Sequence, residues 1–220
     1  MSKRLSRKPA DVFQRSGFTT RTVRANLLRA WNSANDEQLL AGLAWYDDAH
    51  DFAADLARAT DTDLVVVAAV IAALSPQTRW QANKDAAVEL LKNGTRYPGM
   101  LVSNYERAKR VINAGPMGAL AALQTRGDES APKIAAFARN ILGDTDRVTI
   151  DVWASRAALI SARHKDINPE KILSRVGMYE AIAEQYRWLA NKVDVTAPQA
   201  QAVVWVTLTS TPAVTDKADW

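Results

Sequence analysis

Apolar residues recur at helical intervals along almost the whole chain, and the alternation typical of strands is nearly absent. Capping residues and proline or glycine breaks divide this pattern into about ten helices, with Asn104 and Ser130 among the expected N-caps. The predicted helices cover residues 22–33, 36–59, 63–74, 79–93, 105–114, 117–124, 132–143, 151–162, 169–175, 178–191 and 197–209.

Moderate helix lengths and short connections favour an all-α fold. Neither an internal repeat nor a low-complexity linker marks a domain boundary, so we expect residues 21–210 to form a single two-lobed helical domain. Residues 1–20 are predicted to be an irregular basic arm, and residues 211–220 a loose tail.

The composition excludes several classes of protein. Cysteine is absent and only two histidines occur, which excludes disulfides, thiolate zinc sites and iron–sulfur clusters and disfavours a histidine-rich metal site. The longest apolar run, Leu64 to Leu74, is about half of the roughly 20 residues that a membrane span needs. The basic N-terminus is not followed by an apolar segment, so we expect no secretory signal and a cytoplasmic location. We also expect no cofactor.

Positive charge is concentrated near the N-terminus. The whole chain carries a net charge of +4, of which residues 1–29 contribute +7 and residues 30–220 contribute −3. This distribution suggests a polyanionic partner, and the phosphate backbone of a nucleic acid is the commonest one. A solvated tail that aids solubility explains it equally well.

The segment from Lys133 to Arg156 carries candidate chemistry. Lys133 lies at the start of one predicted helix, Asp151 lies 18 residues later at the start of another, and Arg156 follows five residues on. An amine and a carboxylate that face one cleft can attack and stabilise an electron-poor sugar carbon. Asp151 could equally be a simple N-cap, and Lys133 could be a solvated residue in a first turn.

Two blocks resemble the helix-hairpin-helix DNA glycosylases of the endonuclease III type. The first is Ser75-Pro76-Gln77 followed by Asn83-Lys84, at the end of an apolar helix, and the second is the Lys133–Arg156 segment with Asn140 inside it. Residues 104–109 resemble a helix that lies between these blocks in the family. The likeness covers residues 62–160 and implies the two-lobed helical fold of that family.

The resemblance implies a role for each matching residue. Asp151 matches the catalytic carboxylate, Lys133 matches the lysine that attacks the sugar C1′ in members with lyase activity, and Gln77 matches a residue near the gap left by a flipped base. The candidate substrate- or DNA-binding residues are Ser75, Gln77, Arg79, Trp80, Asn83, Asn140, Trp153 and Arg156.

The chain also departs from the family pattern. The family has Gly-x-Gly before its lysine, but residues 129–132 read Glu-Ser-Ala-Pro here, with Asp128 before them and only Gly127 nearby. These acids would repel phosphate, so DNA binding through the hairpin is in doubt and the basic arm could compensate. Trp153 stands where the family usually has histidine, and the cysteine cluster of many members is missing.

Other arrangements of side chains have simpler explanations. Trp80 could stack on a base, with Arg79 supplying a cation, or it could anchor the core. Residues Asp47, His50 and Asp51 share a helical face that could bind a metal, but a solvated face is the better interpretation, and we predict no metal site. His164 is expected at the surface.

Three functions follow from these observations. The first is a DNA base-processing enzyme that acts on a flipped damaged or modified base with Asp151 and Lys133. The second is a transferase that attaches an amino acid or amine to a modified pyrimidine, as in a divergent phage branch of this fold; a phage protein would then act in the host cytoplasm. The third is a non-catalytic DNA-binding or host-interaction module.

Overall fold

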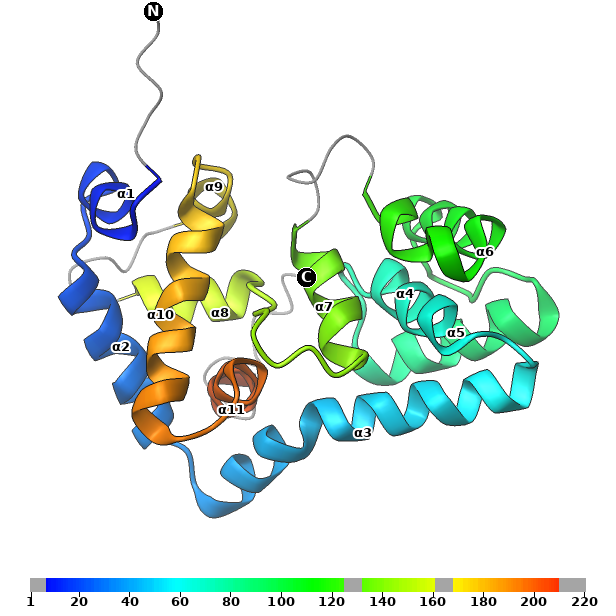
Figure 1. Cartoon of the computed structure of the whole chain (residues 1–220), viewed down its shortest axis with the longest axis horizontal. Coiled ribbons are helices and arrows are strands. Elements are labelled where there is room, and N and C mark those ends of the chain that lie inside the picture. Colours follow the sequence, from blue (N-terminus) through cyan, green and yellow to red (C-terminus); the bar gives the residue numbers. More distant parts are fainter. Residues whose placement is uncertain (1–6, 125–131, 161–167, 210–220) are drawn as a thin grey trace, which may run out of the picture. The chain divides into compact units, whose positions relative to one another are not determined.

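The computed structural model describes residues 7–124, 132–160 and 168–209, and the regular structure in these ranges is helical (Figure 1). The expected all-α fold is therefore confirmed. The helices of the described ranges are α1 (Pro9–Arg15), α2 (Thr20–Asn32), α3 (Asp36–Thr60), α4 (Leu64–Leu74), α5 (Trp80–Asn93), α6 (Val102–Ala122), α7 (Pro132–Ile141), α8 (Val152–Leu159), α9 (Pro169–Leu173), α10 (Met178–Val193) and α11 (Ala197–Thr209).

The chain divides into two compact units, and the boundary falls inside α3. Among the described residues, unit 1 contains residues 7–45, 145–160 and 168–209, and unit 2 contains residues 46–124 and 132–144. Each unit has its own arrangement of helices. None of the described helices is long and apolar enough to cross a membrane.

Unit 1 is built around α10. This helix packs against α1, α2, α9 and α11, and α8 packs against α2, α9 and α11. The side chains of Ile182, Tyr186 and Leu189 on α10 are completely buried. α3 and α11 approach each other closely at Gly42, where an added Cβ atom would lie 2.4 Å from the Cα of Val203 on α11.

Unit 2 is built around α4, which packs against α5, α6 and α7. Every residue of α4 from Val66 to Leu74 is buried. Asp63 begins the helix by accepting a hydrogen bond from the backbone N–H of Val65 at 2.8 Å. A short apolar helix with buried residues on all sides suits the centre of a helical unit.

The N-terminal segment differs from the sequence prediction of an irregular arm over residues 1–20. Pro9–Arg15 form α1, and the side chains of Val12, Phe13 and Phe18 are buried in the core of unit 1. A helix of this length is not stable by itself. Burial of its apolar side chains against α10 stabilises it. The local sequence is rich in charged residues and therefore does not indicate this packing.

The start of α6 is a second correction. Asn104 was expected to cap this helix, but α6 begins earlier, at Val102, and Asn104 is 2% exposed inside it. The expected break at Gly115-Pro116 is confirmed, because Gly115 has a non-helical backbone (φ 63, ψ −176) that separates two helical segments. Proline lacks the N–H that a continuous helix would need at this point.

Candidate functional site

A tight turn joins α4 to α5 and presents Gln77. The backbone N–H of Thr78 donates to the carbonyl oxygen of Ser75 at 3.2 Å, which places Pro76 and Gln77 in the two central positions. Gln77 is exposed and has φ +58, in the left-handed region where glycine is usual. Ser75 is half-buried and its hydroxyl donates to the carbonyl of Ala72 at 2.9 Å, so it closes the end of α4.

Side chains from α6 make hydrogen bonds to the backbone at this turn and at the end of α4. The side-chain amide of Asn104 donates to the carbonyl oxygen of Pro76 at 2.7 Å. Arg107 makes longer contacts to Asn104 Oδ1 at 3.4 Å and to the carbonyl of Ala73 at 3.5 Å. Burial lowers the pKa of Arg107, and the neighbouring charge of Arg110 lowers it further. The backbone before Gln77 is thus fixed by buried polar groups.

Asn83 supports the same region from α5. Its side chain is 1% exposed, and its amide nitrogen donates to the carbonyl of Ile71 at 3.1 Å. Its Oδ1 atom is buried and has no hydrogen-bond partner among the described residues. Asn83 was predicted to contact DNA, but this placement favours a role in joining α5 to α4. Arg79 precedes α5 as its N-cap residue, is exposed, and makes no side-chain cap bond.

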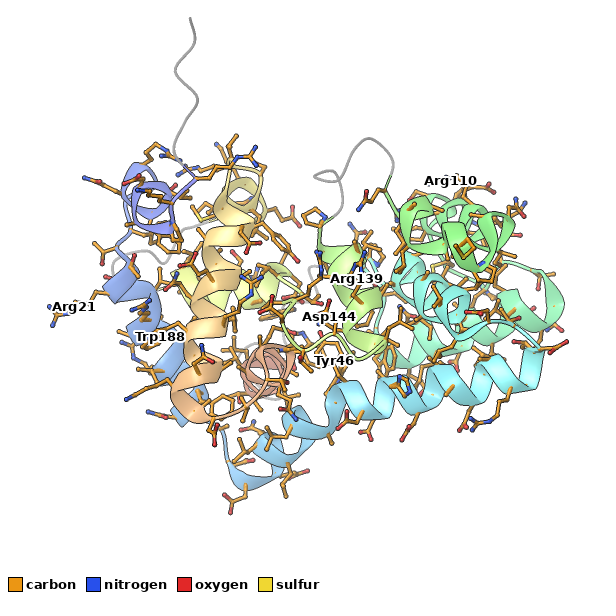
Figure 2. All side chains as sticks on the ribbon, in the orientation of Figure 1. Arg21, Tyr46, Arg110, Arg139, Asp144 and Trp188 are labelled. Atoms are coloured by element: carbon orange, nitrogen blue, oxygen red, sulfur yellow. The ribbon has the colours of Figure 1, made fainter. Side chains whose placement is uncertain are left out.

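Trp80 begins α5 and lies in a chain of aromatic rings within unit 2. Its ring centroid is 6.1 Å from that of Phe52 and 6.4 Å from that of Phe137, and Tyr46 (labelled in Figure 2) is 6.3 Å from Phe137. All three pairs meet edge to face, a favourable geometry. Trp80 is half-buried. It therefore contributes to the core while part of its surface stays exposed.

Two amines lie on the elements that carry these rings. Lys84 Nζ is 5.7 Å from the ring of Phe52 and 5.8 Å from that of Trp80, within the range of cation–π attraction. Lys133 occupies the first turn of α7 and is half-buried. Because it precedes Phe137 by four residues, the two share a face of the helix.

The far end of α7 is tied down by polar contacts. Asn140 is 3% exposed and donates from its amide to the carbonyl of Asp144 at 2.9 Å. A ring nitrogen of His50 lies 2.8 Å from the carbonyl oxygen of Ile141. Asn140 was predicted to contact DNA, but its burial favours a role in shaping the chain after α7.

Asp151 lies in unit 1 and caps α8. Its carboxylate accepts a hydrogen bond from the backbone N–H of Ala154 at 2.7 Å, and the residue is half-buried. The N-cap interpretation is therefore confirmed.

Two tyrosines, the half-buried Tyr179 and the completely buried Tyr186, shape the segment around Asp151. The hydroxyl of Tyr179 donates to the carbonyl of Val148 at 2.9 Å and accepts from the N–H of Ile150 at 3.2 Å. The hydroxyl of Tyr186 donates to the carbonyl of Ala154 at 3.0 Å. Burial raises the pKa of both phenols, and the negative charge of Asp151 raises each further. These contacts fix the backbone on both sides of the capping carboxylate.

Trp153 and Arg156 form a stacked pair on α8. The guanidinium carbon of Arg156 lies 4.8 Å from the ring centroid of Trp153, and both side chains are half-buried. Arginine stacks well on an aromatic face and keeps its edge N–H groups available for hydrogen bonding. The sequence left the partner of Arg156 open, and the structure supplies Trp153.

The two units divide the predicted site. Within unit 2, the turn brings Ser75, Gln77 and Arg79 together, and Trp80, Asn83, Lys133 and Asn140 belong to the same unit. Within unit 1, α8 and its cap bring Asp151, Trp153 and Arg156 together. Lys133 and Asp151 belong to different units, so their convergence stays a prediction.

Several features from the sequence lie outside the described residues: Gly127, Asp128, Glu129, Ser130 and His164. The described residues contain no group of three histidine or acidic side chains that could hold a metal ion, which includes the helical face around His50. The residues that sequence reasoning missed are Asn104 as a clamp and Arg107. The only sign of these roles in the sequence is that Asn104 and Arg107 are polar residues three positions apart, on a helical face that also has buried positions.

The sequence of the chain matches one protein family over most of its length. The family of unknown function DUF7178 matches residues 10–212 of the chain. The chain belongs to this family. No curated protein and no solved structure matches it.

Proposed function

We propose that the chain is a DNA base-processing enzyme that acts on a nucleotide extruded from the duplex. The observation that carries the proposal is the conformation of Gln77. An L-residue in the left-handed region costs about 1–2 kcal/mol, and strain of this kind clusters at functional sites. A glutamine held in that conformation on an exposed, clamped turn suits a side chain that fills the gap left by a flipped base.

The aromatic residues of unit 2 support the same proposal. An extruded base needs a flat apolar surface, and the exposed part of Trp80 can supply one. The turn places Gln77 three residues before Trp80, with Pro76 and Thr78 on either side of Gln77. The gap-filling side chain and the stacking ring would therefore come from one short segment.

In the proposed reaction Lys133 and Asp151 act on the sugar. The neutral amine of Lys133 forms a bond to C1′ while the bond between C1′ and the base nitrogen breaks, and the base leaves with the electron pair. The Asp151 carboxylate stabilises positive charge on the sugar and accepts the proton that the amine loses. The reaction requires no metal ion.

The direct test is to incubate the purified chain with duplexes that contain damaged or modified pyrimidines. Nucleoside mass spectrometry would detect a released base. When the sugar ring of the Lys133 adduct opens, the C1′–nitrogen bond becomes an imine, which borohydride would reduce to a stable covalent link. Asp151→Asn should abolish product, because the amide keeps the cap but removes the charge. An Asp151→Asn variant with full activity would refute the mechanism.

Gln77→Gly tests the role of the turn without damage to the fold. Glycine adopts the left-handed conformation easily, so the variant should fold at least as well as the parent. We expect product formation to fall about tenfold or more, an effect of the size seen when positioning is lost. The matched control is Gln14→Ala, an exposed glutamine on α1.

The same assay distinguishes the other two functions. A mass gain on a modified pyrimidine without an abasic site would identify a transferase. Salt-sensitive DNA binding that survives loss of both Lys133 and Asp151, without any product, would identify a non-catalytic binding module.

A further inference from the structure

Arg24 on α2 is held by two contacts within unit 1. Its Nε atom donates to Oε1 of Gln185 at 2.9 Å, and its guanidinium carbon lies 4.6 Å from the ring centroid of Trp188. Gln185 is completely buried, and its own amide donates to the carbonyl of Ala181 at 3.3 Å. The hydrogen bond and the stacked ring together fix the plane of the guanidinium.

The terminal nitrogens of this guanidinium, Nη1 and Nη2, make no hydrogen bond or ion pair with any described residue, and the side chain is only half-buried. Two parallel N–H groups on a fixed plane match the oxygens of a phosphate. Since the side chain is already ordered, a phosphate would bind without the usual loss of arginine rotamer entropy.

The surface around Arg24 is basic. α2 contains Arg21, Arg24 and Arg29 and no acidic residue, and none of these three arginines forms an ion pair with a described residue. Nη1 of Arg29 donates to Oδ1 of Asn26 at 3.3 Å. Glu184, one turn before Trp188 on α10, is exposed and forms no ion pair with them. Figure 2 shows Arg21 extending outward from α2 and Trp188 on the neighbouring helix α10. These three positions span about 140° around the helix, with Arg21 between the other two. We call the surface that they form the arginine face.

The length of the arginine face suits a nucleic acid strand. Arg21 and Arg29 are eight residues apart, or about 12 Å along the helix axis. This distance corresponds to three or four nucleotides at a rise of about 3.4 Å per nucleotide. A single small anion would require only one of the three arginines.

We propose that the arginine face binds the phosphodiester backbone of DNA, with both terminal nitrogens of Arg24 on one phosphate and Arg21 and Arg29 on its neighbours. The choice of DNA over other polyanions rests on the proposed function. Unit 1 would thereby supply the backbone contacts that the acidic residues at 128 and 129 disfavour.

The experiment measures binding of the full chain to a short unmodified duplex by fluorescence anisotropy, between about 50 and 200 mM salt. We expect Arg24→Ala to weaken binding about tenfold and to reduce the slope of log affinity against log salt by about 1. Arg24→Lys keeps the charge but loses the paired geometry, so it should weaken binding by several-fold. The control is Arg175→Ala, an exposed arginine elsewhere in unit 1.

The double variant Arg21→Ala/Arg29→Ala provides an independent test, since both side chains are exposed and their loss should not affect folding. We expect a lower affinity and a salt slope reduced by about 2. If this variant and Arg24→Ala both bind DNA as tightly as Arg175→Ala, with the same salt slope, the proposal is wrong. Arg24 would then serve only to cover Trp188.

Two further outcomes keep this proposal separate from the proposed function. If the parent chain releases no base and the arginine variants lose DNA binding, the result supports the arginine face and refutes the proposed enzymatic function. If the chain is an active enzyme and the arginine variants bind DNA normally, only the proposal for the arginine face is refuted. If the variants lose binding to anionic lipid vesicles but retain binding to DNA, the partner is a membrane surface and the proposal fails.

Discussion

The side-chain amide of Asn104 donates to the carbonyl oxygen of Pro76 at a distance of 2.7 Å, and this bond fixes the residue directly before Gln77. Asn104 is buried on α6, 27 positions from Gln77 in the chain. The bond therefore makes the exposed turn part of the core of unit 2, and it explains how a strained glutamine is kept in place.

Replacement of Asn104 by alanine should destabilise the protein and loosen the turn. The hydroxyl of Thr78 also donates to the carbonyl of Pro76, at 3.2 Å, so the variant loses one buried hydrogen bond without leaving that oxygen unpaired. We therefore expect the free energy of unfolding to fall by about 1 kcal/mol. Urea unfolding measures this change. The control is Asn113→Ala, an exposed asparagine on the same helix, which should change stability by less than about 0.5 kcal/mol. Equal effects of the two substitutions would show that the clamp contributes nothing.

Asp151 should show separate structural and chemical roles. Asparagine is as good an N-cap as aspartate, so Asp151→Asn should unfold at nearly the parent's urea concentration. Asp151→Ala removes the bond to the N–H of Ala154 and should cost about 1 kcal/mol. The matched control is Asp63→Ala, which removes the capping bond at the start of α4. An Asp151→Asn variant as unstable as Asp151→Ala would mean that the charge, and not the cap, stabilises the fold.

Gly42→Ala should destabilise the protein although alanine is the better helix former. Helix propensity alone predicts a gain of about 1 kcal/mol. The added Cβ would, however, meet the Cα of Val203 at 2.4 Å and its backbone nitrogen at 2.7 Å. Overpacking of this kind costs about 1–3 kcal/mol, so thermal unfolding should shift to lower temperature.

A second substitution identifies the source of that loss. Val203→Ala removes the side-chain atom that lies 2.6 Å from the added Cβ but leaves the backbone atoms in place. The combined Gly42→Ala/Val203→Ala variant should therefore recover little stability. Full recovery would show that the clash involves only the valine side chain.

Tyr179 and Tyr186 should make the protein sensitive to alkali. Burial raises the pKa of Tyr179 and Tyr186, so above about pH 10 the unfolded chain loses these protons while the folded chain keeps them. The unfolded state then binds fewer protons, and stability falls as pH rises, by up to about 1.4 kcal/mol per pH unit for each tyrosine. Below that pH neither phenol contributes to the dependence.

Chemical unfolding at a series of alkaline pH values and constant ionic strength measures this slope. Tyr186→Phe should lower stability near neutral pH, because the bond to Ala154 is lost, but should also make the alkaline decline shallower. An unchanged slope in the Tyr186→Phe variant would contradict the assignment of this phenol as a titrating group.

Local signals predicted the helices well because each depends on a few neighbouring residues. The positions of α3, α4, α5, α10 and α11 follow from apolar spacing and caps, and glycine at the end of α5 has the expected left-handed conformation (φ 70). The same signals misjudged Asn104, since an asparagine before a helical stretch is usually a cap. Its actual partner, Pro76, comes from a distant segment that no local pattern specifies.

The candidate site shows the same division. The sequence alone placed Gln77 after a proline at a helix break and Asp151 at the start of α8, because caps and breaks are encoded within a few residues. Only the tertiary structure decided that Asn83 and Asn140 are buried and that Asn104 fixes the turn below Gln77. It also decided that the guanidinium of Arg24 lies over the ring of Trp188. Hydrogen bonds and stacking between distant segments depend on how helices pack, and packing is decided by the whole core rather than by any one stretch of chain.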